Sequence, residues 1–259
     1  MQEQSSESIP PVVALPVLLS VRAAGPGEQW IVPTTRKRWV VGLLCTWSAF
    51  TFAMILYHLA VIAIIHRTRA GHPVSKEFGV RIDVIYTALS FANVGIYLAL
   101  GVLFCCWFYR VVRNASLLNP EARQSAGLAA ASFFIPIYNL FAPCGYASFA
   151  WRESSLAASI DWKSPRSIAP VIIWWIAWFV MCISGYATMI VDRITASHKR
   201  TLNELEFSQS LYCAQEVIAL GAAGACLYLV VNITRMQASI QANAHSAAPA
   251  LLQSDAATA

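Results

Sequence analysis

Four polar residues lie within or at the edge of long apolar stretches of this 259-residue chain, and they are the first candidates for chemistry: His58, Asn93 and Asn139 within a stretch and Glu216 at the edge of one. A histidine or a carboxylate in apolar surroundings could relay protons or couple ion movement, and the asparagines could line a path for a small solute. Each residue also has a plainer interpretation. His58 and the asparagines could hydrogen-bond a neighbouring helix, and Glu216 could reach water at a nearby end of its stretch.

The sequence predicts neither a catalytic centre nor a metal site. A metal ion needs several ligands close together, but His58 is the one histidine inside an apolar stretch. The chain lacks the motifs G-x-S-x-G, H-E-x-x-H and G-x-x-x-x-G-K-[ST] and has no Cys-x-x-Cys. Its seven cysteines lie within or beside apolar stretches, so we interpret them as reduced packing residues. We therefore expect a protein that is not an enzyme and has no cofactor.

A second polar pattern ends one apolar stretch, where Trp107, Arg110 and Asn114 follow one another at i, i+3 and i+7. This spacing puts the three side chains on one face of a helix. Two interpretations stay open. Trp107 and Arg110 could anchor the helix at a membrane surface, with the arginine reaching headgroups. Alternatively, Arg110 and Asn114 could form a polar cluster with Asn139, because a guanidinium offers five hydrogen-bond donors.

Prolines break the stretch that contains Asn139. Pro136 and Pro143 flank this residue, and a proline removes a backbone donor and kinks a helix. Backbone groups freed inside a membrane must be satisfied by protein or by a water-filled cavity. We therefore predict a kink or break between Ile135 and Pro143, with Asn139 facing protein rather than lipid.

The elements that carry these residues are apolar stretches long enough to cross a membrane. The chain is 58% hydrophobic and 12% charged, whereas a soluble domain carries about 25% charged residues. A spanning helix needs about 20 apolar residues. We predict an all-α integral membrane bundle of four to five transmembrane helices, with a flexible tail at 1–35, the helical domain at 36–236 and a disordered tail at 237–259. The stretches without Asp, Glu, Lys or Arg are Trp39–Ile65, Val84–Tyr109, Gln124–Trp151, Ser167–Val191 and Val217–Thr234.

Charge indicates the membrane rather than nucleic acid as the partner. The formal net charge is +5, but the basic residues gather at the ends of the apolar stretches. Lys and Arg at such ends orient membrane proteins, and both arrangements of the third stretch leave more of them on the N-terminal side. We expect a multi-pass protein of the cell membrane with a cytoplasmic N-terminus. Small residues at Gly221 and Ala225 could support a homo-oligomer, because they allow helices to approach closely.

Four motifs follow one another between residues 104 and 178. W-x-x-R-x-x-x-N occupies Trp107 to Asn114, F-x-P-x-x-N-L-x-x-P occupies Phe134 to Pro143, W-R-x-S occupies Trp151 to Ser154, and a Trp-rich helix begins near Trp174. In this order and spacing the chain resembles bacterial multi-pass membrane proteins that are classified only as a domain of unknown function. The resemblance implies about four to five helices and no established activity. Members often carry an Arg-Glu pair before the Trp-Arg, where this chain has Ser148 and Phe149.

Two functions are compatible with these features. The first is a non-enzymatic scaffold or regulator of membrane partners, and the sequence does not identify the partner. The second is a conduit for a small solute or ion that uses the Pro-broken third stretch, because discontinuous helices form binding sites near the middle of the bilayer.

Overall fold

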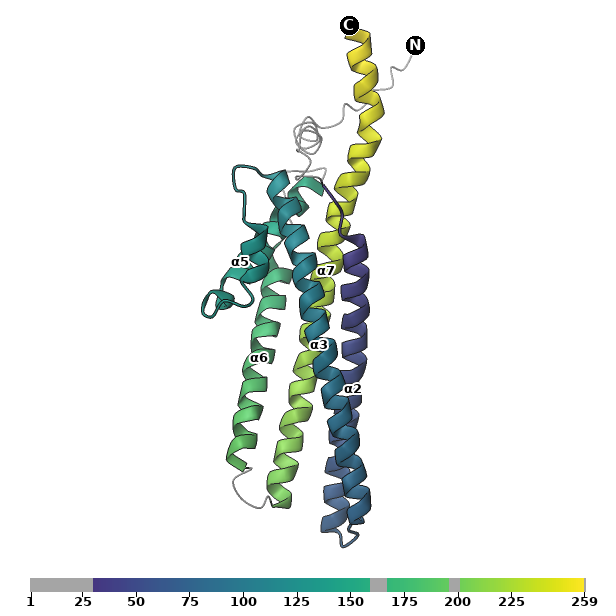
Figure 1. Cartoon of the computed structure of the whole chain (residues 1–259), viewed down its shortest axis with the longest axis vertical. Coiled ribbons are helices and arrows are strands. Elements are labelled where there is room, and N and C mark those ends of the chain that lie inside the picture. The colour runs from purple at the N-terminus through teal and green to yellow at the C-terminus, as the bar shows by residue number, and fades with distance from the viewer. Residues whose placement is uncertain (1–29, 159–166, 196–200, 259) are drawn as a thin grey trace, which may run out of the picture. The chain divides into compact units, whose positions relative to one another are not determined.

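The computed structural model describes residues 30–158, 167–195 and 201–258, and these ranges contain helices and no strand (Figure 1). Four helices contain stretches long and apolar enough to cross a membrane: α2, α3, α6 and α7. The predicted all-α membrane bundle is therefore confirmed, with four candidate spans. The helices are α2 (Thr34–Arg69), α3 (Lys76–Leu118), α4 (Ala126–Ala131), the 3₁₀ helix η1 (Tyr138–Leu140), α5 (Ala142–Ala158), α6 (Ala169–Thr195) and α7 (Leu202–Thr258).

Local capping signals set the ends of several helices. Gly71 follows α2 at φ 86°, and the backbone N–H of His72 donates to the carbonyl of Arg67 at 3.1 Å. This bond and the positive φ form a Schellman motif, which ends the helix at a residue without a Cβ. At the start of α7, the Thr201 N–H donates to the Glu204 carboxylate at 2.8 Å, and the Glu204 N–H donates to the Thr201 hydroxyl at 3.3 Å. The pair is a capping box that starts the helix.

The chain divides into two compact units, where the sequence predicted one domain over 36–236. Unit 1 comprises Met1–Thr34, Cys106–Ile168 and Val231–Ala259, and unit 2 comprises Thr35–Cys105 and Ala169–Val230. Both α3 and α7 contribute one part to each unit. Because two long helices are shared, a division of the sequence into consecutive ranges could not find this arrangement.

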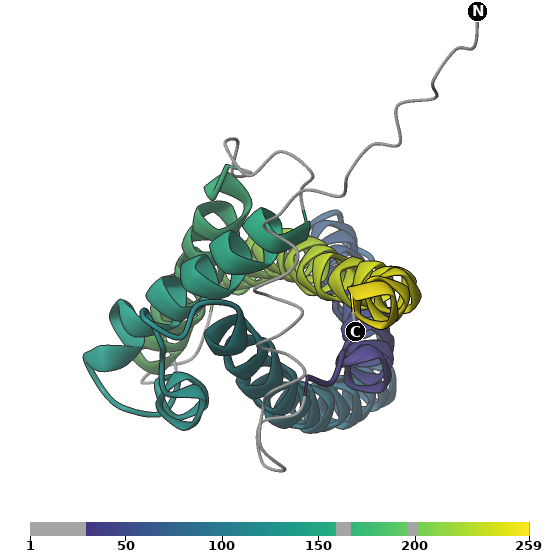
Figure 2. The same ribbon diagram turned by 90° about the horizontal axis from the view of Figure 1, so that it is seen from above.

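Unit 2 is a ring of four helix segments, in the order α2, α3, α6 and α7, that run side by side (Figure 2). Large apolar side chains point out of this unit; Phe91 is 76% exposed. A surface of this kind suits lipid rather than water. Ring contacts join neighbouring helices: Trp47–Tyr97 joins α2 to α3 with ring centroids 5.5 Å apart, Phe104–Trp174 joins α3 to α6 at 5.9 Å, and His58–Tyr212 joins α2 to α7 at 5.3 Å. Helices α6 and α7 approach closely at Gly185, where an added Cβ would lie 3.0 Å from Gln215 Nε2.

Unit 1 surrounds the C-terminal part of α3. Trp107, Phe108, Val111 and Val112 are all fully buried, so this part of the helix is enclosed on every side. The segments around it are α4, η1, α5, the last part of α7 and the residues just before α2. A helix that is buried all round forms the core of its unit.

The predicted tail boundaries need one correction. The C-terminal residues from 237 are helical rather than disordered, because α7 continues to Thr258, and Gln237 itself is fully buried. This segment is rich in alanine, the residue with the highest helix propensity, so an existing helix can extend through it. Residues 1–29 of the predicted N-terminal tail lie outside the described residues.

Candidate functional site

Asn114 and Arg110 meet at one backbone carbonyl in unit 1. Asn114 Nδ2 donates to the carbonyl oxygen of Ile31 at 2.9 Å, and Arg110 Nε donates to the same oxygen at 3.2 Å. Asn114 is fully buried and Arg110 is 7% exposed. Ile31 lies three residues before α2, so two side chains of α3 fix the position at which the chain enters α2.

Gln237 of α7 extends this arrangement to α5. Its side-chain oxygen accepts from Asn114 Nδ2 at 2.8 Å, and its Nε2 donates to the Val111 carbonyl and to Ser154 Oγ, both at 3.1 Å. Nearby, Trp107 Nε1 donates to Thr234 Oγ1 at 3.0 Å. We call this set of residues the motif cluster: Trp107, Arg110, Asn114, Ser154, Thr234 and Gln237, with the Ile31 carbonyl.

The geometry of the motif cluster bears on both interpretations of the α3 pattern. Trp107 is fully buried and hydrogen-bonded to α7, and Arg110 is buried against protein backbone. Neither residue is positioned as an interface anchor, which would leave the indole and the guanidinium facing headgroups. These side chains instead join α3 to α7 and to the residues that precede α2.

The predicted break of the third stretch is confirmed and is a γ-turn. Ile137 has φ 66° and ψ −51°, and the N–H of Tyr138 donates to the carbonyl of Pro136 at 2.7 Å. A positive φ is a strained conformation for a β-branched residue. The stretch therefore consists of the short helix α4, the turn, η1 and α5, none of which is a candidate span.

The residues around the break lie apart from the motif cluster. Asn139 is half-buried, its side-chain oxygen has no hydrogen-bond partner among the described residues, and no hydrogen bond joins it to Arg110 or Asn114. The expected burial of Asn139 against protein is compatible with this position. Pro136 is exposed, whereas Pro143 is buried in the first turn of α5, where its missing N–H breaks no helical bond.

A pair of tyrosines spans the end of the break. The hydroxyl groups of Tyr138 in η1 and Tyr146 in α5 lie 3.1 Å apart. Burial, and then the hydrogen bond to Tyr138, raise the pKa of Tyr146 to about 12. Tyr146 is 8% exposed, so this side chain is part of the packing that holds η1 on α5.

Of the intramembrane polar residues, His58 has the most developed surroundings. It is 1% exposed, its Nδ1 lies 2.7 Å from Gln209 Oε1, and its ring stacks on Tyr212. Glu216 is half-buried in unit 2 and faces the Thr51 hydroxyl. Asn93 is also half-buried and forms no side-chain hydrogen bond with the described residues.

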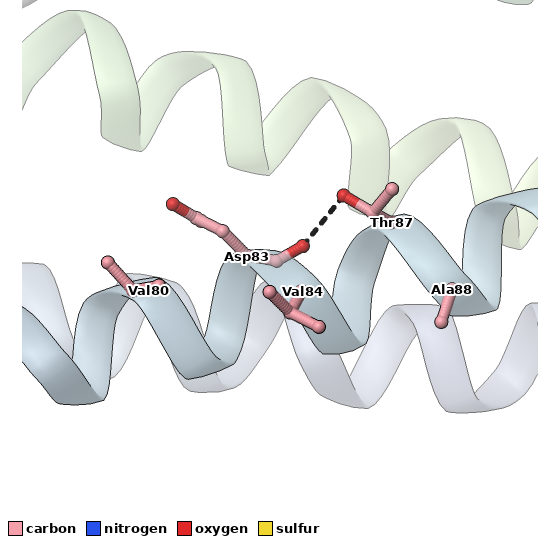
Figure 3. Close-up of a pocket in the computed structure, with 5 residues that line it drawn as sticks. All are labelled: Val80, Asp83, Val84, Thr87 and Ala88. Atoms are coloured by element: carbon pink, nitrogen blue, oxygen red, sulfur yellow. Dashed lines mark hydrogen bonds between the residues drawn. The ribbon is translucent and has the colours of Figure 1, made fainter.

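The described residues offer little else that could bind a ligand. These residues contain no group of three or more His, Cys, Asp or Glu that could hold a metal ion, and none of the seven cysteines forms a disulfide. An open depression on α3 is lined by Val80, Asp83, Val84, Thr87 and Ala88, and Thr87 Oγ1 donates to the Asp83 carbonyl at 2.8 Å (Figure 3). Because one helix supplies all five residues, the depression does not enclose a ligand.

The sequence interpretation missed the two residues that complete the motif cluster from outside the predicted domain. Ile31 and Gln237 were assigned to the tails, although Gln237 lies three residues after Thr234 and shares its helix face. That spacing was a usable signal. The role of the Ile31 carbonyl had no signal, because a backbone acceptor can belong to any residue type.

Comparison with known proteins gives a family but no characterised relative. Residues 67–235 match the model of a family described as a domain of unknown function (DUF4328). The match includes all four motifs and ends two residues before Gln237. Neither a curated protein nor a solved structure matches the chain.

Proposed function

Because the chain belongs to the DUF4328 family, a domain of unknown function, we propose a role from the geometry of its own residues: a non-enzymatic membrane scaffold or regulator of membrane partners. One observation carries the proposal. The motif residues use their polar groups on one another, since Asn114, Gln237 and Ser154 form a continuous set of hydrogen bonds inside unit 1. A ligand site would instead present such groups to a cavity.

Such a cluster makes the helix ends of unit 1 rigid. Buried polar networks favour one arrangement of their helices, because most alternatives leave further buried groups without partners; here the Asn114 side-chain oxygen has no hydrogen-bond partner among the described residues. Three sequence-distant segments are joined, near residues 31, 114 and 237. A rigid frame of this kind suits a protein that acts through its outward faces rather than through an internal site.

The outward face of α7 in unit 2 is the best candidate for a protein contact. Val217, Gly221, Gly224 and Tyr228 follow one another at helical spacing, and Val217 and Tyr228 are exposed. A Cβ at Gly221 or Gly224 would meet nothing of its own chain within 4 Å. The small residues therefore leave room for a neighbouring helix at close range, from a second copy of the chain or from a partner.

Photo-crosslinking in cells tests this function. A photo-reactive residue at Val217, 56% exposed, should give a discrete protein adduct, whereas Ile183 on α6, 54% exposed, is the matched control. The mass of the adduct distinguishes a second copy from another protein. Gly221→Leu, which fills the small-residue face, should abolish the adduct at Val217. Lipid adducts alone at both positions would contradict the scaffold.

A conduit is the second candidate, and the strained break is the observation that favours it. Ile137 is held at positive φ, and the nearby Asn139 oxygen is buried without a partner in the described residues. Strained backbone often marks functional sites. Purified protein in liposomes should then pass a small solute at a rate that Asn139→Leu reduces. Equal fluxes with and without the protein would remove this candidate.

We also propose the cytoplasmic membrane as the location, with the N-terminus in the cytoplasm. The support is the basic group Arg36, Lys37 and Arg38 at the start of α2. Four crossings then return the C-terminal end of α7 to the same side.

A further inference from the structure

A line of polar side chains follows the contact between α2 and α7 in unit 2, and we call it the α2–α7 seam. On α2 the members are spaced by eight and seven residues, which keeps them on one face of the helix. Each member faces a polar residue of α7, which runs antiparallel to α2. The facing pairs are His66 and Glu206, His58 and Gln209, and Thr51 and Glu216.

The outer end of the seam is open to water. His66 Nε2 lies 3.1 Å from the Glu206 carboxylate, and the His66 side chain is 58% exposed. Arg69 forms an ion pair with the same carboxylate and donates to Asn203 at 2.6 Å. These groups lie at the last turn of α2 and the first turns of α7, beside the ends of the candidate spans. A proton from solution can therefore reach His66 and Glu206.

His58 is the next protonatable group along the seam. Gln209 Oε1 can only accept a hydrogen bond, so Nδ1 of His58 carries the proton in this pair and Nε2 remains to take another. Three tyrosines surround the ring, and their centroids lie 5.3 Å (Tyr57), 6.0 Å (Tyr86) and 5.3 Å (Tyr212) from it. The imidazole is therefore enclosed among aromatic side chains, and the Tyr212 ring stacks on it.

The inner end of the seam is a carboxyl group without a basic partner among the described residues. No Lys or Arg of the described residues forms an ion pair with Glu216. Thr51 is fully buried, and its hydroxyl lies beside this carboxylate and interacts with it. An ionised carboxylate in a membrane span is costly, and protonation removes the charge.

Tyr86 of α3 lies beside His58, with the two ring centroids 6.0 Å apart. Its hydroxyl interacts with Ser90 and lies within electrostatic range of Asp192 on α6 and of Glu216. Tyr57 lies within electrostatic range of Asp83 on α3, so titratable groups near the imidazole include these acids and tyrosines. One turn of α2 beyond Thr51, the Trp47–Tyr97 ring pair closes the seam with apolar surface.

We propose that the α2–α7 seam is a one-sided access path that delivers a proton from the His66 end, through His58, to Glu216. In this path, a proton from the outer end binds Nε2 of neutral His58. The imidazolium then loses one proton, through the Tyr86 hydroxyl or water, to the Glu216 carboxylate. The products are neutral imidazole and a neutral carboxylic acid, so charge and atoms balance without a co-reactant. The path is independent of the scaffold proposal.

Infrared spectroscopy of the full chain in lipid nanodiscs tests the path. After a jump to acidic pH, the wild type should gain the carbonyl band of a protonated carboxylic acid, and Glu216→Gln should lack this band. His58→Gln should slow its appearance by about 100-fold, within the range for loss of a positioned acid–base group. His72→Gln is the matched control, because His72 is exposed in the loop after α2 and outside the seam.

Several outcomes would overturn the proposal. The band could persist in Glu216→Gln, or appear in His58→Gln at the wild-type rate. If Glu216→Gln does not fold, as judged by helix content and gel filtration, Glu216→Asp is measured instead. This variant should keep a carboxylic acid band at a shifted frequency. Absence of that band would contradict Glu216 as the proton acceptor. Proteoliposomes with an internal pH dye distinguish access from conduction. A sustained proton flux across the membrane would show a through-channel and refute the one-sided path.

Discussion

Replacing Asn114 by leucine should cost unit 1 much of its stability, and the hydrogen bonds of the motif cluster give the magnitude. Asn114 Nδ2 makes two bonds, at 2.9 Å to the Ile31 carbonyl and at 2.8 Å to Gln237 Oε1. Each is worth about 1 kcal/mol net, and the Gln237 oxygen left buried without a donor costs about 1–3 kcal/mol more. We expect Asn114→Leu to lower the free energy of unfolding by about 3–5 kcal/mol.

Gln237→Leu provides the second side of a double-mutant cycle. This change removes three hydrogen bonds, to Asn114, to the Val111 carbonyl and to Ser154, so we expect a loss of about 3 kcal/mol or more. Each single variant loses the shared Asn114–Gln237 hydrogen bond and leaves the partner's polar group buried without it, so this cost is included in both measured losses. The double variant should therefore lose about 2 kcal/mol less than the sum, within the range known for residues in contact.

Equilibrium unfolding in mixed detergent micelles, followed by tryptophan fluorescence, measures this coupling. Asn114→Leu combined with Asn139→Leu is the control pair, because Asn139 is not bonded to the motif cluster. The losses of that pair should add within about 0.5 kcal/mol. Additive losses for Asn114→Leu and Gln237→Leu would refute the reasoning. So would coupling in the control pair, which would return Asn139 to the cluster.

Three further predictions concern other parts of the chain. Reporter fusions at residues 30 and 198 should report the cytoplasm and the external side respectively. Three candidate spans, α2, α3 and α6, separate the two positions, because the third stretch does not cross. Equal signals would contradict this topology. Ile137→Gly should raise thermal stability by about 1 kcal/mol, because glycine tolerates φ 66°, whereas Ile137→Pro should destabilise strongly; melting curves in detergent measure both. Tyr146 has a pKa near 12, above its ordinary 10.0, so its contribution to stability is complete below pH 10 and falls as the pH rises toward 12. Tyr146→Phe should lose less stability than the wild type over that interval, and equal losses would show that the group is not involved.

The sequence predicted the elements well because membrane crossing depends on length and apolar content. The runs at Trp39–Ile65 and Val84–Tyr109 lie inside α2 and α3. The break in the third stretch was also predictable, since Pro136 cannot donate a backbone hydrogen bond. Its γ-turn at Ile137 was not, because nothing in an isoleucine favours a positive φ.

The site was predictable only in part. The common face of Trp107, Arg110 and Asn114 followed from helical spacing, and all three side chains are buried in unit 1. Their partners did not follow from it. Thr234 and Gln237 lie more than a hundred residues further along the chain, and which helices become neighbours depends on packing that local patterns do not record.

The long sequence separation between Asn114 and Gln237 has a consequence for the synthesis of the protein. The two residues are 123 positions apart, so a ribosome adding about 5–20 residues per second needs roughly 6–25 s to make the second after the first. During that interval Asn114 Nδ2 lacks its acceptor, the Gln237 side-chain oxygen, so α3 is already made while its polar contacts are incomplete. We expect the nascent chain to be vulnerable to membrane quality-control proteases until α7 is made. A premature stop codon before position 237 should leave that exposure permanent, and the truncated product should be degraded rather than accumulate.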